Sequence, residues 1–316
     1  MSENGRRGRA WSARVSDTLT FAVAPASSLL SAALHRGRTL APGETIPRIE
    51  AVADAVSPDS LRLASVYSDV TGFAAADPLP ITFPVVLTSG LQLAVMSAPE
   101  FPLPVLGIVH TRQTITRFRH FSGRERLSAS VVVEGHRIVR GGGEFDLVTE
   151  LRAGSETVWR GVTTILSRGI RGDGVKRLAE QPPTGSVTRS VRWRLGADQG
   201  RRYAAVSGDY NPIHLTALSA RLFGFPRAIA HGWWTLARCL AEMDTDVPEA
   251  AEVDVRFLAP VSLPGTVTFE SGPLTAVGKR ARFEVRGRTG KEHDARLIVG
   301  TLGEPGSEVR TCAVPS

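Results

Sequence analysis

The sequence predicts an α+β protein built from two similar halves. Three observations lead to this class. Each half combines an apolar helical run with several alternating, strand-like runs. A stretch rich in glycine, proline and charge, residues 171–186, separates the halves and is typical of a linker. Residues 61–73 in the first half also repeat the front of a motif in the second half, so the first half is interpreted as a degenerate copy of the second.

The N-terminal residues 1–45 are predicted to be a tail and lead-in. A basic segment followed by an apolar one superficially resembles a signal peptide. Asp17 ahead of the apolar run and Pro25 inside it argue against that interpretation. No run reaches the roughly 18 apolar residues that a membrane-spanning helix needs. We therefore expect this segment to be a basic tail with a short amphipathic part that packs on the first half.

The first half, residues 46–170, is predicted to hold one buried helix and four strands. Pro84 precedes residues 85–96, whose apolar side chains recur on most faces of a helix. Strand-like runs then follow, with turn signals at residues 121–123, 134–135 and 153–154. The predicted strands are 105–118, 125–134, 137–151 and 157–165.

The second half, residues 187–304, follows the same plan, and residues 305–316 are predicted to be a C-terminal tail. A strand comes first, then a motif region, then four alternating runs with a proline-rich turn between the first two. The predicted strands are 187–195, 252–257, 266–271, 280–288 and 295–302.

Composition narrows the class of function. Hydrophobic content of 42% with 22% charged residues is ordinary for a soluble globular protein. The net charge of +7 comes almost wholly from arginine, a bias that often reflects genomic base composition as much as function; its functional interpretation is attraction to acidic partners. No basic run with interleaved aromatic residues indicates nucleic-acid binding. Cys239 and Cys312 do not have the spacing of a zinc site or a disulfide framework, which favours a reducing, cytoplasmic location.

The motif region places a carboxylate and an imidazole five residues apart, at Asp209 and His214. Gly208 and Asn211 favour a turn between them. Pro212 fixes its own φ and biases the preceding residue away from helix, so the two side chains lie on either side of a break. This geometry lets them converge on one small volume, as an acid/base pair requires. A further helix is predicted from about residue 215 to 223, ended by a glycine.

A third element begins at His231 and Gly232, where a mostly apolar helix over residues 233–243 starts. The first N–H groups of a helix have no partner within it, and its dipole favours negative charge there. A glycine in the first turn allows a ligand oxygen to come close. This helix start is therefore a candidate site for a carbonyl oxygen that becomes an oxyanion.

The residues SGDYNPIH, followed by GFPRAIAHGWWT, resemble the hydratase-2 motif of the MaoC-like dehydratases, the (R)-specific enoyl-thioester hydratases. The resemblance implies a double hotdog fold without metal, nucleotide or redox cofactor. It also implies that Asp209 and His214 hold the catalytic water, and that the N–H of Gly232 binds the thioester oxygen. Two residues depart from the family pattern: Trp233 replaces the usual Met, and Thr216 replaces a frequent Asp.

The predicted function is that of a (3R)-hydroxyacyl-thioester dehydratase or (R)-specific enoyl-CoA hydratase in fatty-acid or related acyl-chain metabolism. Its substrate would be a thioester of coenzyme A or of an acyl carrier protein, both acidic partners. The chain would act as a monomer of two repeats or as a homodimer. The secondary candidates for substrate binding are Ser207, Asn211, His231, Trp233 and Arg227.

These secondary residues also have structural interpretations. Ser207 and Asn211 can serve the turn, His231 can be a structural or pocket-lining group, and Trp233 can be a pocket wall. Arg227 is expected to meet a phosphate or to stay solvated. The sequence leaves open which of Asp209 and His214 is the formal base, as well as the acyl length, the thioester carrier and the physiological direction. A hotdog thioesterase and a non-catalytic acyl-thioester binding subunit remain alternatives.

Overall fold

The computed structural model describes residues 11–15, 46–53, 60–103, 105, 108–139, 142–167, 186–243, 247–273, 280–290 and 292–306. The first half holds β1 (Trp11–Val15), β2 (Ile49–Ala53), α2 (Ser60–Thr71), α3 (Pro84–Leu87), α4 (Ser89–Met96), β3 (Val109–Arg117), β4 (Leu127–Val139), β5 (Gly142–Ala153) and β6 (Glu156–Ser167). Most of the predicted linker lies outside the described residues, so the boundary between the halves stays a prediction.

The second half holds β7 (Arg189–Leu195), α5 (Gln199–Ser207), the 3₁₀ turn η1 (Pro212–His214), α6 (Ala217–Arg221), β8 (Ala228–Ile229), α7 (Gly232–Glu242), β9 (Ala251–Phe257), β10 (Ser262–Leu263), β11 (Gly265–Ser271), β12 (Arg280–Thr289) and β13 (Glu292–Gly303). No helix in the described ranges combines the length and the apolar character needed to cross a membrane.

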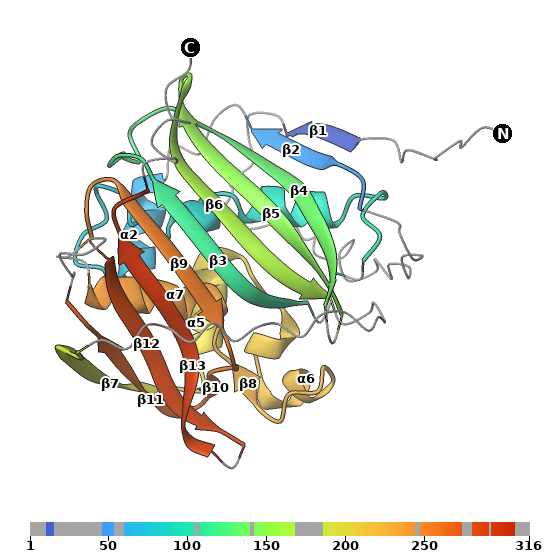
Figure 1. Cartoon of the computed structure of the whole chain (residues 1–316). Coiled ribbons are helices and arrows are strands. Elements are labelled where there is room, and N and C mark those ends of the chain that lie inside the picture. Colours follow the sequence, from blue (N-terminus) through green and yellow to red (C-terminus); the bar gives the residue numbers. More distant parts are fainter. Residues whose placement is uncertain are drawn as a thin grey trace.

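Eleven strands form one sheet, in the order β1-β2-β4-β5-β6-β3-β9-β13-β12-β11-β7 (Figure 1). The two halves share a topology. Leaving β1 aside, the first half has the order β2-β4-β5-β6-β3 from its outer edge to the centre of the sheet, and the second half has the order β7-β11-β12-β13-β9. In each half, the second of these five strands along the chain is therefore the one at the centre of the sheet. The two second strands, β3 and β9, meet in the middle as an antiparallel pair. The predicted class, α+β with two similar halves, is confirmed.

The helices lie on one side of this sheet and fill its concave face (Figure 1). Helix α7 buries Leu236 and Leu240 completely, and α4 buries Leu91 and Val95 to the same degree. Both belong to one continuous hydrophobic core that spans the two halves. A side chain of this size stabilises the fold by about 1.5–3 kcal/mol when it is fully buried. The two central helices are therefore held by burial of their apolar faces.

The internal repeat predicted at residues 61–73 is visible as α2, the counterpart of α5. Tyr67 in α2 and Tyr203 in α5 each lie five residues before a glycine, and their rings meet at a centroid distance of 6.3 Å. Those glycines, Gly72 and Gly208, both have positive φ, 91° and 74°. The copies differ at the next position, where the second half has an aspartate and the first half a phenylalanine.

Three predicted features differ in the structure. The helix predicted over residues 85–96 is divided at Thr88, whose hydroxyl donates to the Pro84 carbonyl at 2.9 Å and so competes with the regular helix. The turn predicted at residues 134–135 is a β-bulge, because Gly135, with φ 55°, lets β4 continue to Val139. Within the predicted tail, β1 pairs in parallel with β2.

The junction of β3 and β9 is reinforced by side chains. Arg112 forms a bidentate pair with Asp254 across the two strands, with N···O distances of 2.9 and 2.6 Å. The buried Arg117 donates to the carbonyls of Pro248 and Glu249. A bidentate arginine pair fixes register as well as adding energy. These contacts join the two half-sheets into one.

This junction generates a prediction for the isolated second half. A protein starting at Ser186 would expose the β9 edge and the apolar surface that contacts the first half, and open sheet edges pair with other chains. We expect such a protein to be insoluble or self-associated in size-exclusion chromatography with light scattering. A soluble, folded monomer would contradict this dependence of the second half on the first.

Candidate active site

The turn after α5 is shaped by Gly208 and by hydrogen bonds to its neighbours. Gly208 ends α5 with a φ of 74°, a conformation that favours glycine. Ser207 Oγ donates to the Tyr203 carbonyl at 2.9 Å and accepts from the Asp209 N–H at 3.2 Å. Asp209 Oδ1 in turn accepts from the Asn211 N–H at 3.1 Å. The Asp209 carboxylate is therefore held at the end of α5 with Oδ2 available.

His214 stands at the end of the 3₁₀ turn η1, which begins with Pro212. The Asn211 side chain caps this turn by accepting from the Ile213 N–H. The turn packs directly on α5 at Gly200, where a Cβ would lie 1.9 Å from the His214 carbonyl oxygen. Only a glycine leaves room for this approach. The position of His214 relative to Asp209 is thus set by backbone contact.

The protonation of His214 follows from its partner. Its Nδ1 lies 2.8 Å from the Ile229 carbonyl, and a carbonyl can only accept, so Nδ1 carries the proton. The carbonyl is held in place because β8 pairs with β10 and the Ala230 N–H donates to the Val261 carbonyl. His214 Nε2 is left with a free lone pair on a side chain that lines the cavity.

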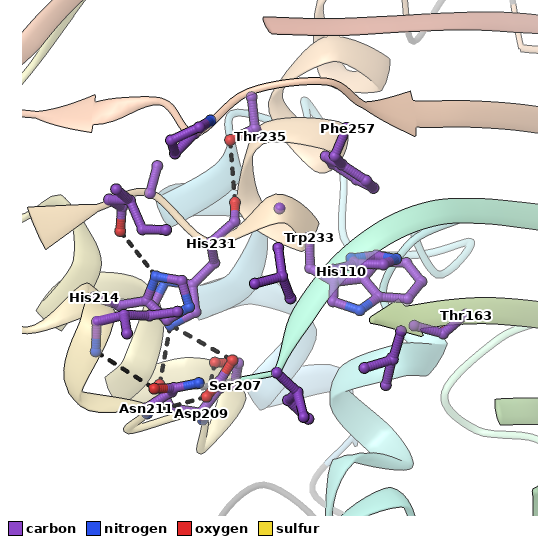
Figure 2. A pocket seen from close by; sticks show the side chains of 18 of the residues that line it. His110, Thr163, Ser207, Asp209, Asn211, His214, His231, Trp233, Thr235 and Phe257 are labelled. Carbon is purple, nitrogen blue, oxygen red and sulfur yellow. Dashed lines mark hydrogen bonds and ion pairs between the residues drawn. The ribbon is translucent and has the colours of Figure 1, made fainter. Parts of the chain in front are cut away.

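His231 lies beside this pair (Figure 2). Its Nε2 donates to the Asp209 backbone carbonyl at 3.0 Å and lies 3.7 Å from Asp209 Oδ2. Its ring stacks on the His214 ring with a centroid distance of 3.7 Å and an angle of 27°. His231 therefore contacts both members of the predicted acid/base pair.

Burial keeps both imidazoles neutral. It lowers the pKa of His214 to about 3, helped by the neighbouring His231 and opposed by Asp209 and by the bond to Ile229. Burial also lowers the pKa of His231 against the attraction of Asp209. Desolvation raises the pKa of the Asp209 carboxyl, but its interactions with His231 and His214 and the hydrogen bond from the Asn211 N–H outweigh it, so the pKa lies below its usual value. The site thus combines a carboxylate with a neutral imidazole at neutral pH.

The start of α7 faces the same space. His231 is the N-cap residue, and no side chain accepts from the first N–H groups of this eleven-residue helix. A Cβ added at Gly232 would lie 3.1 Å from Phe257 Cε1 and 3.2 Å from His110 Nδ1. The backbone at Gly232 is therefore closely packed on one side and has uncapped donors that suit an oxyanion.

A cavity of about 600 Å³ connects these groups and lies between the two halves. The second half contributes the polar end described above. The first half contributes a largely apolar wall from α3, α4, β3 and β6. The members of that wall with apolar side chains include Val85, Leu93, Met96, Val109, Ile165 and Leu166. The volume falls within the range of small-molecule sites.

The comparisons with known proteins agree with this geometry. Residues 175–296 match the family model described as MaoC like domain. A curated relative, 3-hydroxyacyl-thioester dehydratase X of Mycobacterium tuberculosis (strain ATCC 25618 / H37Rv), is 35% identical over 208 residues, which cover 64% of this chain and 72% of the relative. The chain belongs to the MaoC-like dehydratase family.

Solved structures of MaoC-like proteins share the architecture. The crystal structure of HtdX from Mycobacterium tuberculosis matches with a TM-score of 0.66 and 30% identity, over 80% of this chain and 98% of that one. A MaoC-like dehydratase from Phytophthora capsici matches with a TM-score of 0.63 over 84% and 97% of the two chains, at 18% identity, and so shares the fold. The predicted hotdog class is confirmed.

Most of the site residues predicted from the sequence line the cavity of this MaoC-like protein. They are Ser207, Asp209, Asn211, His214, His231, Gly232 and Trp233. Arg227 is not among the lining residues and is exposed. Thr216, a departure from the family pattern, also lies outside the cavity, where its side chain caps α6 by accepting from the Ser219 N–H. Trp233, the other departure, forms part of the wall.

His110 is a cavity residue that the sequence did not indicate. It lies on β3 of the first half, and its ring stacks at centroid distances of 4.4 Å from Phe257 and 5.2 Å from Trp233 (Figure 2). Gln113 Oε1 contacts His110 Nε2 at 3.2 Å, and its amide is oriented by donating to the Thr114 carbonyl. Burial lowers the pKa of His110 to about 4. An isolated histidine in a strand carries no motif that would have identified it.

Asp209, His214 and His231 also have the composition of a metal site, with ligand atoms within 4.8 Å of one another. The contacts fit an acid/base site better. One nitrogen of each histidine already donates to a carbonyl. The two rings also stack at an angle of 27°, so their remaining lone pairs lie in roughly parallel planes.

The lowered pKa of His214 predicts how stability depends on pH. The pKa is about 3 in the folded chain and 6.5 for an ordinary histidine, so the unfolded chain binds the proton more tightly. The free energy of unfolding is then highest above about pH 6.5 and falls as pH falls toward about 3. His214→Asn keeps an N–H donor but cannot titrate. In urea denaturation at about pH 7.5 and about pH 5, it should show a smaller pH effect than the parent. Equal pH effects would contradict the buried, neutral state of His214.

Proposed function

We propose that this chain is a (3R)-hydroxyacyl-thioester dehydratase, equivalently an (R)-specific enoyl-thioester hydratase. The observation that carries the proposal is the joint placement of Asp209 Oδ2, His214 Nε2 and the uncapped start of α7 around one cavity. An anion, a neutral base and an oxyanion donor are the three groups that elimination of water next to a thioester needs. The named relative, 3-hydroxyacyl-thioester dehydratase X, supports the same reaction.

The substrate would bind with its thioester oxygen at the Gly232 N–H and its acyl chain along the apolar wall of the first half. The helix dipole favours the charge that develops on this oxygen as an enolate forms. This interaction strengthens on the way to the transition state, so it accelerates the reaction and does not merely bind substrate. Trp233 and His110 would confine the thioester beside the helix start.

In the direction of dehydration, His214 Nε2 would take the proton from C2, and the electron pair would move toward the thioester oxygen. The hydrogen bond from Nδ1 to Ile229 holds the imidazole in the required tautomer. Asp209 would accept a hydrogen bond from the 3-hydroxyl and stabilise the imidazolium. The proton then passes from Nε2 to the departing hydroxyl, the C3–O bond breaks, and water and the enoyl-thioester result.

His231 is assigned a positioning role in this reaction. Its bond to the Asp209 carbonyl uses Nε2, and its ring covers one face of His214. It therefore fixes the distance between base and carboxylate. The alternative reactions are less well supported. A thioesterase would need an activated water directed at the thioester carbonyl, whereas Asp209 and His214 occupy the hydratase motif.

The first test of the proposal replaces the two reacting groups. Asp209→Asn and His214→Asn should each lower the rate of hydration of a short trans-2-enoyl-CoA by at least about a hundredfold, the scale of a lost acid/base group. The assay follows loss of the conjugated double bond together with release of free thiol. His136→Asn, a histidine outside the cavity, serves as the control. Thiol release without hydration would replace the proposal by a thioesterase, and near-parent hydration in either variant would remove that residue from the mechanism.

The second test distinguishes the roles of two closely packed glycines, Gly232 and Gly200. In Gly232→Ala the new methyl group meets side chains that can shift, so we expect stability to fall by about 1 kcal/mol while kcat/KM falls at least about tenfold. In Gly200→Ala it meets the His214 backbone, so we expect a loss of about 3 kcal/mol or more in stability. Thermal denaturation and hydration assays give both quantities. The oxyanion role of Gly232 is wrong if its variant turns over like the parent.

A further inference from the structure

Helix α6 lies behind the cavity wall and does not line the cavity itself. Its buried residue Ala220 packs with Ile213, Phe225 and Ile229 in a small hydrophobic cluster, and these last three side chains line the cavity. The opposite face of α6 is left open. Figure 1 shows the helix on the periphery of the molecule, beside β8.

Two leucines make this open face apolar. Leu218 and Leu222 are separated by four residues, so they lie on the same side of α6. They are 74% and 81% exposed, the highest values among the large hydrophobic side chains in the described ranges. Single exposed leucines are common on protein surfaces, whereas two neighbouring exposed leucines beside a cavity are a candidate interaction site.

The surroundings of the two leucines are basic. Arg201, Arg221 and Arg227 are exposed, and none of them forms an ion pair within the described part of the chain. Arg201 reaches the start of α6 by donating to the Leu215 carbonyl at 2.8 Å. The sequence contains no Asp or Glu from residue 210 to residue 241. We call Leu218, Leu222, Arg221 and Arg227 the α6 surface; it combines an apolar pair with uncompensated positive charge.

The α6 surface also lies close to the opening of the cavity. The chain enters α6 from Pro212 and His214 and leaves it toward Phe225, all of which line the cavity. Tyr210, another lining residue, is 42% exposed and so belongs to the rim. A partner bound on α6 could therefore insert a flexible arm into the site without moving away from the helix.

We propose that the α6 surface docks an acidic, amphipathic helix of an acyl carrier protein whose thioester arm enters the cavity past Tyr210. The proposal rests on the proposed function, and it names the partner that delivers the thioester. The arginines match acidic side chains of such a helix and accelerate its encounter. The leucines match its apolar residues. The phosphates of free coenzyme A would pair with the arginines. Its soluble nucleotide, however, offers no apolar surface against which the two leucines could be buried.

The test compares one reaction on three carriers, using enoyl groups attached to a carrier protein, to coenzyme A and to N-acetylcysteamine. The double variant Leu218→Ser/Leu222→Ser removes the apolar pair from exposed positions, and Arg221→Glu reverses one charge. We expect each to lower kcat/KM by about tenfold on the carrier-protein substrate, the scale of burying part of two leucines or losing one charge pair. Turnover of the N-acetylcysteamine thioester should be unchanged.

Matched controls come from surfaces away from the cavity. Val66 on α2 is 46% exposed, so Val66→Ser removes an exposed apolar side chain, and Arg194→Glu reverses an exposed charge on β7. Both variants should have the same kcat/KM as the parent on all three substrates. Light scattering of the parent and the leucine variant measures whether the α6 surface holds a second copy of this chain.

Three results would overturn the proposal. If the leucine variant keeps full activity on the carrier-protein substrate, the α6 surface does not dock it. If the variants lower kcat/KM on the coenzyme A substrate as much as on the carrier-protein substrate, the surface binds the nucleotide. If the variant changes from dimer to monomer, the surface is a self-interface. Failure of the proposed function looks different, because the parent would then not hydrate even the N-acetylcysteamine thioester, while binding of the loaded carrier to parent and variant would still test the docking.

Discussion

The hydrogen bond from His214 Nδ1 to the Ile229 carbonyl is the contact on which the proposed chemistry depends. It fixes the tautomer of His214, in which Nδ1 carries the proton. Nε2 therefore presents a lone pair to the cavity and not an N–H group. The surrounding structure holds both the donor and the acceptor of this hydrogen bond in place. The short β8–β10 pair holds the acceptor, and the close approach of the 3₁₀ turn to Gly200 holds the donor. Burial then keeps the ring uncharged, as a base requires.

The first half lacks the proposed acid/base pair but lines the same cavity. Where the second half has Asp209 after its glycine, the first half has Phe73, which is buried in the core. The first half contributes to the wall of the cavity through α4 and through His110 on β3. The pairing of β3 with β9 makes this possible because it brings the two concave faces together as one surface. The shared sheet thus explains why the second half can supply the polar groups of the site while the first half supplies its wall.

The sequence sufficed for features that depend on local rules. Asp209, His214 and Gly232 lie within one short stretch whose glycines and proline dictate the turns, so their convergence could be predicted. Contacts between distant segments could not. His110 reaches the site only through the β3–β9 pairing, and the bond of His231 to the Asp209 carbonyl depends on how α7 packs against the turn. Arg227 shows the converse, since its closeness in sequence does not bring it to the cavity.

The central position of β3 has a consequence during synthesis. Arg112 on β3 and Asp254 on β9 are 142 residues apart, and the first half leaves the ribosome long before its partner strand exists. Until then β3 is an open edge beside an unfilled apolar surface, the arrangement that most readily recruits strands from other chains. The time taken to translate the second half therefore sets how long the β3 edge of a nascent chain is open to pairing with other chains.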